Sequence, residues 1–161
     1  MQSIPIDKIK VTELCREADI GRATFYEYFE NIYAVATWFY TQILNESLYA
    51  LENGLSFEGA HLRLYEAMLE HKSFFARAFR SDDYNSVYNY GNREIAEHYL
   101  ELIPQKLGRP LSQEEALQVR LFTAGAAFLT TEWAQQGMKR APAELARVCA
   151  AAAPTPFDCL Q

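Results

Sequence analysis

Cysteine, glycine and proline are scarce in this sequence, which has 3, 7 and 6 of them among its 161 residues. The cysteines, Cys15, Cys149 and Cys159, are odd in number and far apart, and no CxxC pair occurs. This usage argues against a disulfide framework or a zinc site, and it indicates reduced thiols in a cytoplasm.

Long apolar runs are absent as well. No stretch reaches the length that spans a membrane, and the N-terminus MQSIPIDKIK lacks the continuous apolar core of a signal peptide. Half of the residues are hydrophobic and 14% are aromatic, which is typical of a folded globular chain. We therefore expect a cytoplasmic protein that has no membrane partner.

Sequence motifs of the common enzyme classes are also missing. The chain contains no HExxH, GxSxG, Walker or GxGxxG motif. A di-iron helical enzyme needs two Glu-x-x-His pairs, and Glu58 with His61 is the single pair of this kind. The sequence thus predicts no enzymatic activity, no cofactor and no metal site.

What recurs throughout is the spacing of an amphipathic helix, and no run alternates as a strand does. We therefore predict an all-α fold. Pro104 is expected to end one helix, Ser112 and Glu115 to begin another as a capping box, and Pro142 to occupy a first turn. The predicted helices cover residues 11–18, 22–28, 31–52, 58–71, 73–79, 82–103, 112–136 and 142–153.

The first two predicted helices form a helix-turn-helix. They are short and are separated by three residues that end in Gly21, which we expect to adopt the left-handed turn conformation. Phe25 and Phe29 are four residues apart, so they share one helix face and anchor it to the core. The second helix is then free to enter the major groove of DNA.

The opposite face of that second helix has the chemistry of a DNA-reading surface. Arg22 stands at its start, Thr24 reaches a phosphate or a thymine methyl, and Tyr26 and Tyr28 place hydroxyls at the ends of flat rings. The candidate DNA-binding residues are Lys10, Arg22, Ala23, Thr24, Tyr26, Glu27 and Tyr28.

Residues 24–29, TFYEYF, match the T-[FL]-Y-x-[YH]-F hallmark of the TetR/AcrR family, and residues 5–9 and 14–20 are similar to that family's entry into its helix-turn-helix. The N-terminal part therefore resembles a TetR DNA-binding domain. Residues 128–133 with Gly137, and residues 141–145, look like the C-terminal domain of one TetR subgroup.

The resemblance implies a helix-turn-helix domain over residues 1–44 and a helical-bundle domain for ligand binding and dimerisation over residues 45–161. It implies a homodimeric repressor that binds a double-stranded DNA operator and is released from it by a small-molecule effector.

Several features depart from the family pattern. Only residues 1–4 precede Pro5, where the family has a further helix, so we expect the motif to lack that cover. Ile32 stands where a phosphate-binding lysine is usual, and Lys10 stands where a Ser or Thr caps the helix.

The net charge is −6, and residues 1–44 carry four basic and six acidic side chains. We therefore expect weaker DNA binding than is usual, and a TetR-like module that does not read DNA, acting as a ligand sink or a partner of another regulator, remains the alternative.

The resemblance also implies an effector cavity between the long helices. Aromatic rings with polar tips suit such a cavity, because they line apolar space and still offer directed hydrogen bonds. The candidate ligand-binding residues are Phe39, Ile43, Tyr65, Leu69, His71, Tyr84, Tyr88, Ile95, His98, Tyr99 and Phe122.

The predicted helix over residues 112–136 is apolar on two sides, so it needs two partners. One is the core of its own chain, and the other is either a second copy or further core of a monomer. The resemblance assigns the last two helices to a four-helix dimer interface. The candidate interface residues are Leu117, Leu121, Ala124, Gly125, Phe128, Glu132, Leu145 and Val148.

Overall fold

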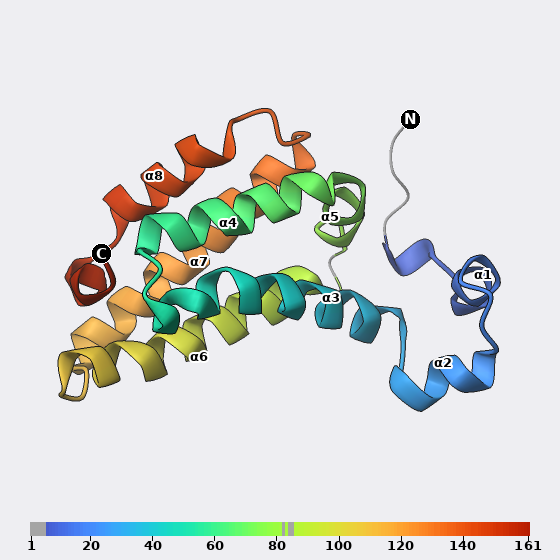
Figure 1. The fold of residues 1–161 in the computed structure, drawn as a ribbon, viewed down its shortest axis with the longest axis horizontal. Coiled ribbons are helices and arrows are strands. Elements are labelled where there is room, and N and C mark those ends of the chain that lie inside the picture. Colours follow the sequence, from blue (N-terminus) through green and yellow to red (C-terminus); the bar gives the residue numbers. More distant parts are fainter. Residues whose placement is uncertain (1–5, 82, 84–85) are drawn as a thin grey trace.

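The computed structural model describes residues 6–81, 83 and 86–161, and every regular element among them is helical (Figure 1). The predicted all-α class is confirmed. The elements in chain order are η1 (Ile6–Lys8), α1 (Val11–Glu17), α2 (Arg22–Tyr28), α3 (Ile32–Glu46), η2 (Leu48–Asn53), α4 (Phe57–Glu70), α5 (Lys72–Ala78), α6 (Val87–Leu107), α7 (Gln113–Gln135), α8 (Pro142–Ala152) and η3 (Thr155–Leu160), where η denotes a 3₁₀ helix.

The helices form a bundle with a small lobe at one end. Figure 1 shows α1 and α2 beyond the N-terminal end of α3, away from the long helices. Within the bundle, α4 packs along α8, α6 packs along α7, and α3 contacts both α4 and α6. Leu44, Phe57, Phe75 and Phe157 are completely buried at the centre. The helix α3 therefore connects the small lobe to the core of the bundle.

The third predicted helix is interrupted. It was expected to run to residue 52, but α3 ends at Glu46 and η2 follows it. At the junction, the buried Ser47 donates its hydroxyl to the carbonyl of Ile43 at 2.6 Å. Such a local bond competes with regular helix geometry, which explains the break. Gly54 then ends η2 in the left-handed conformation with φ 86°.

Pro104 does not end its helix, so that prediction is wrong. The helix α6 continues through it to Leu107 and ends at Gly108, whose φ is 67°. Proline removes one backbone hydrogen bond, but the neighbouring Leu102 and Ile103 are buried. Their burial offsets the loss.

Candidate DNA-reading helix and ligand cavity

The turn between α1 and α2 uses an aspartate where a glycine was expected. Asp19 has the left-handed φ of 54°, whereas Gly21 has an extended backbone with φ −71°. The backbone amide of Ile20 donates to the carbonyl of Cys15 at 3.0 Å. The backbone amide of Asp19 donates to the carbonyl of Arg16 at 3.3 Å. This is the Schellman pattern, which needs a left-handed residue one position past the helix cap. A short polar side chain tolerates that conformation, so the prediction for Gly21 is wrong and the residue that turns the chain is Asp19.

Two phenylalanines anchor α2 from its inner side. Phe25 is 2% exposed, and its ring lies 5.8 Å from that of Phe29. Phe29 in turn meets Trp38 of α3 at 5.9 Å. These edge and tilted ring contacts are the favourable arrangements for aromatic pairs. They fix α2 against the start of α3.

The outer side of α2 lies in solvent. Tyr26 is 50% exposed and Tyr28 is 75% exposed. Their rings and hydroxyls are therefore accessible from outside the chain. The remaining candidates, Lys10, Arg22, Ala23, Thr24 and Glu27, are exposed as well.

Two of the departures seen in the sequence have structural consequences. Lys10 is the N-cap residue of α1, and it makes no side-chain capping bond. Ile32, the first residue of α3, is half-buried and packs against the core cluster instead of pointing outward. Asn31 caps α3 by accepting from the amide of Ala34 at 2.9 Å. The start of α3 therefore serves the core at the position where the family pattern has a phosphate contact.

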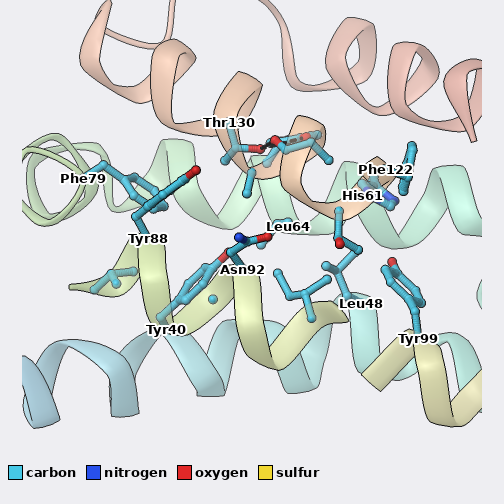
Figure 2. A pocket seen from close by; sticks show the side chains of 17 residues that line it. Tyr40, Leu48, His61, Leu64, Phe79, Tyr88, Asn92, Tyr99, Phe122 and Thr130 are labelled. Carbon is cyan, nitrogen blue, oxygen red and sulfur yellow. Dashed lines mark hydrogen bonds between the residues drawn. The ribbon is translucent and has the colours of Figure 1, made fainter. Parts of the chain in front are cut away.

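A small, partly open cavity lies between α3, α4, α6 and α7 (Figure 2). Its volume is about 30 Å³, which is room for a water molecule or two. It is mainly apolar, with a few hydroxyl, amide and imidazole groups. The lining residues are Tyr40, Leu48, His61, Leu64, Tyr65, Phe79, Val87, Tyr88, Gly91, Asn92, Ile95, Tyr99, Phe122, Thr123, Ala126, Ala127 and Thr130.

One polar group of the cavity wall is satisfied within the protein. The Tyr65 hydroxyl lies 3.1 Å from Thr130 Oγ1 and 3.2 Å from Cys149 Sγ. Burial raises the pKa of Tyr65 well above its usual value and also raises that of the Cys149 thiol. Both groups are therefore neutral, and they hold α4, α7 and α8 together.

His61 is a buried neutral imidazole. Its Nδ1 lies 2.9 Å from the carbonyl of Phe57. A carbonyl only accepts, so the proton sits on Nδ1 and leaves Nε2 as an acceptor. Burial lowers the pKa of His61 to about 4, and the bond to Phe57 opposes this only in part.

Tyr99 contributes a hydroxyl that has no hydrogen-bond partner among the described residues. The side chain is 1% exposed, and burial raises its pKa well above the usual value. Figure 2 shows its hydroxyl pointing toward His61 and Phe122. A buried unsatisfied hydroxyl is uncommon and costs stability. It therefore marks this side of the cavity as a place where a partner is missing.

Gly91 allows α3 and α6 to approach closely at the cavity. A Cβ built there would lie 2.6 Å from Cε1 of Tyr40. The Tyr40 ring thus rests on the backbone of α6, and any larger residue at position 91 would displace the ring.

The structure brings five of the sequence-predicted ligand residues to the cavity, namely Tyr65, Tyr88, Ile95, Tyr99 and Phe122. Three of them fall on one stripe of α6, together with Gly91 and Asn92, at helical spacing. Tyr84 lies outside the described residues.

The other five candidates lie elsewhere, and two of them sit one position off the facing stripe. Phe39, beside the lining residue Tyr40, packs its ring 4.9 Å from both His71 and Phe74. His98, beside Tyr99, packs on Tyr49 at 4.3 Å. Leu69 and His71 are exposed, and Ile43 is buried outside the cavity.

Sequence reasoning missed Tyr40, His61, Asn92 and Thr130. The helical spacing of Tyr40 with Ala36 and of His61 with Tyr65 was available in the sequence. Which side of each helix faces the cavity depends on how the helices pack, so spacing alone did not identify these residues.

A second candidate surface lies on the outer side of α7 and α8, and we call it the α7/α8 face. Leu117, Leu121, Phe128 and Val148 are 67%, 77%, 64% and 45% exposed. Gly125 and Glu132 are exposed beside them, and Ala124 is half-buried. Leu145 was expected here, but it is 2% exposed and belongs to the core of its own chain, because α8 turns that side toward α4. A groove of about 240 Å³ runs between the two helices on this side.

The comparisons with known proteins bear on the bundle. A family model for the C-terminal region of TetR-type transcriptional regulators matches residues 56–153, which is more than half of the chain. The chain belongs to the TetR family of transcriptional regulators. No curated protein shows significant sequence similarity to it.

The matched region begins at the cap of α4 and ends just after α8, so it contains most of the cavity wall and the whole α7/α8 face of this TetR-family chain. None of the described helices is both long enough and apolar enough to cross a membrane. Within the described ranges, no group of three or more His, Cys, Asp or Glu residues is placed to hold a metal ion.

Proposed function

We propose that this regulator is a cytoplasmic, homodimeric repressor that binds operator DNA through α2 and leaves it when a small molecule enters the cavity. Residues 1–44 act as the DNA-binding domain, and residues 45–161 bind ligand and dimerise. The family is one of transcriptional regulators, and the proposal includes no enzymatic activity.

The observation that carries the DNA-binding part is the orientation of α2. On its inner side Phe25 is buried and Phe29 is half-buried against Trp38, while Tyr26 and Tyr28 face solvent together with Arg22. A short helix that follows a tight turn and presents such side chains is suited to the major groove. The phosphates would meet Arg22, and the groove edges would meet the tyrosines.

The ligand-response part rests on α3, which touches both candidate sites. Near its middle, the ring of Trp38 contacts that of Phe29 at the end of α2. Two residues later, Tyr40 lines the cavity. The hydroxyl oxygen of Thr41 also lies 2.9 Å from the hydroxyl of Tyr90 on α6, which is another helix of the cavity wall. A ligand that moved Tyr40 or α6 would therefore move the helix against which α2 is anchored.

The dimer part rests on the α7/α8 face. Three large apolar side chains of α7 and one of α8 are more than two-fifths exposed. Each is already partly buried, so covering it would contribute less than the roughly 1.5–3 kcal/mol expected for a fully exposed side chain. A second copy of the same face would cover them, and two reading helices would then address two half-sites.

The second candidate function, a ligand-binding module that does not read DNA, is favoured by one observation. The reading lobe has more acidic than basic side chains, and Ile32 packs inward where a cation would contact phosphate. Phosphate contacts supply much of the affinity of DNA-binding proteins. A shortage of basic side chains in this lobe would therefore lower its affinity for DNA.

Fluorescence anisotropy with the promoter DNA beside the protein's own gene tests the proposal. We expect salt-sensitive binding at micromolar protein or below, and loss of most of it in the double variant Arg22→Ala, Tyr26→Ala. Both side chains are exposed, so the variant should keep the helix content and oligomeric state of the parent. The matched control is Lys72→Ala, which removes an exposed cation from α5 of the bundle.

Absence of salt-sensitive binding in the parent would favour the module that does not read DNA. If the double variant unfolds instead, the α2 side chains serve the core and the reading surface is disproved.

A further inference from the structure

We propose that the cavity takes an uncharged, largely apolar molecule of about single-ring size that accepts a hydrogen bond from Tyr99 and donates one to His61. The inference names the chemistry of the effector and rests on the ligand response proposed above. The test measures ligand binding without DNA. The inferred ligand chemistry and the proposed ligand response can therefore be disproved separately.

The side chains that line the cavity determine which ligand charge it accepts. None of the described residues that line the cavity has a charged side chain. An ion moved from water into such a site loses its hydration and finds no counter-charge. A neutral molecule avoids that loss, so the wall selects for neutrality.

The hydrogen-bond donor is the hydroxyl of Tyr99. It is buried and has no partner among the described residues. The ring is fixed by its neighbours, because it lies 5.9 Å from that of Phe57 and 5.0 Å from that of Phe157. The hydroxyl is therefore held in place and points toward His61 (Figure 2). A ligand acceptor placed there would satisfy it.

The acceptor is Nε2 of His61. With Nδ1 donating to the Phe57 carbonyl at 2.9 Å, the ring has one remaining polar atom, and burial keeps it free of a proton at neutral pH by lowering the pKa to about 4. The ring of His61 is 4.4 Å from that of Phe57, which Tyr99 also contacts. The donor and the acceptor therefore lie at the same end of the cavity.

The size of the ligand follows from what must move to admit it. A cavity of about 150 Å³ accommodates benzene, whereas this one has about 30 Å³. Tyr88, Asn92 and Ile95 on α6 are half-buried, so their side chains shift at less cost than the fully buried ones. Admitting a single ring thus requires these side chains to move outward, and a larger molecule would require the fully buried ones to move as well.

Four probes of nearly equal size separate the chemical features. Benzamide both accepts and donates, acetophenone only accepts, isopropylbenzene does neither, and benzoate is an anion. We would titrate each into the full chain, without DNA, and follow binding by NMR to millimolar probe. Benzamide and acetophenone should bind, and benzoate should bind at least tenfold more weakly than benzamide.

Two variants assign the contacts. Tyr99→Phe should weaken benzamide and acetophenone by roughly tenfold, the usual worth of one hydrogen bond, and should leave isopropylbenzene within about twofold. His61→Phe should weaken benzamide by the same factor and leave acetophenone unchanged. Should His61→Phe fail to fold, Tyr99→Phe still decides, because it removes only a hydroxyl that has no partner in the described part of the chain.

Benzoate binding as well as benzamide, or a Tyr99→Phe effect equal for all three neutral probes, would overturn the inference. So would the absence of binding by all four probes. If the probes bind as expected but never release promoter DNA, the inference stands and the proposed ligand response fails.

Discussion

At the scale of single residues, the hydroxyl of Tyr99 is one of three buried side-chain polar atoms that lack a hydrogen-bond partner among the described residues. The Tyr99 side chain is 1% exposed, whereas the hydroxyl of Tyr65 has two hydrogen-bond partners. The two tyrosine hydroxyls thus differ in what they contribute to the stability of the fold. A binding site that leaves a polar group unsatisfied until its ligand arrives trades stability for recognition.

This difference predicts opposite effects of the same substitution. Tyr99→Phe should raise the free energy of unfolding by about 1 kcal/mol, because it removes an unsatisfied buried hydroxyl. Tyr65→Phe, the matched control, should lower it by a similar amount, because Thr130 and Cys149 lose their partner. Urea denaturation of both variants measures this. A Tyr99→Phe protein less stable than the parent would mean that the hydroxyl has a partner in solution.

His61 makes stability depend on pH in a defined window. Its pKa is about 4 in the folded protein and 6.5 as a free side chain, so between these values the unfolded chain binds more protons. Stability is therefore full above about pH 6.5 and falls as the pH drops toward 4, by about 2 kcal/mol between pH 7 and pH 5. Burial also lowers the pKa of His98, which adds a contribution of the same sign.

We expect His61→Phe to reduce the dependence of stability on pH. The dependence should not vanish, because His98 still contributes to it. The measurement is the urea midpoint of parent and variant at several pH values from 7 to 5. The matched control is His71→Phe, which makes the same replacement at an exposed position. Equal slopes in all three proteins would show that His61 is not buried neutral.

At the scale of elements, the link between α1 and α2 sets how the reading helix is presented. The left-handed residue is Asp19, and Gly21 has a backbone that any residue adopts. A Cβ at position 21 would meet nothing closer than Thr24 Oγ1, at 3.7 Å. Within the link between α1 and α2, Gly21 thus makes no use of the conformational freedom of glycine.

The turn predicts a contrast between two substitutions. Gly21→Ala should change the free energy of unfolding by less than about 0.5 kcal/mol, since it adds neither strain nor a clash. Asp19→Val should cost about 1–2 kcal/mol, because a β-branched residue is strained in the left-handed region. Thermal unfolding of both variants checks this. Greater damage from Gly21→Ala than from Asp19→Val would contradict the observed turn.

At the scale of the whole molecule, α7 has two faces with different tasks. One side carries Phe122, Ala126 and Thr130 to the cavity, and the opposite side carries Leu121 and Phe128 into solvent. If that outer side is covered by a second copy, any movement of α7 at the cavity is also felt at the dimer interface.

The α7/α8 face predicts the state of the protein in solution. Light scattering should give about 37 kDa, twice the 18.5 kDa of one chain. Leu121→Glu should produce a monomer at tens of micromolar that keeps its helix content, since it buries a charge at the interface and nothing in the monomer core. The matched control is Leu69→Glu, on the exposed part of α4, and it should remain a dimer. A monomeric parent would remove the interface argument.

The sequence by itself determined the class and most of the elements of this protein. Helical periodicity and capping residues act within a few positions of the chain, so the extent of α2, the capping box at Ser112 and the burial of Phe25 opposite Tyr26 could all be predicted. The exceptions were local conflicts that packing decided, such as the continuation of α6 through Pro104.

Only the tertiary structure decided which residues meet in the cavity. Tyr40, His61 and Tyr99 come from three helices, and the side that each helix turns inward depends on its rotation against its neighbours, by steps of one residue. Phe39 and His98 were displaced by one such step. The same rotation placed Leu145 in the core and left Leu121 and Phe128 outside, because α8 packs on α4 along the side that carries Leu145.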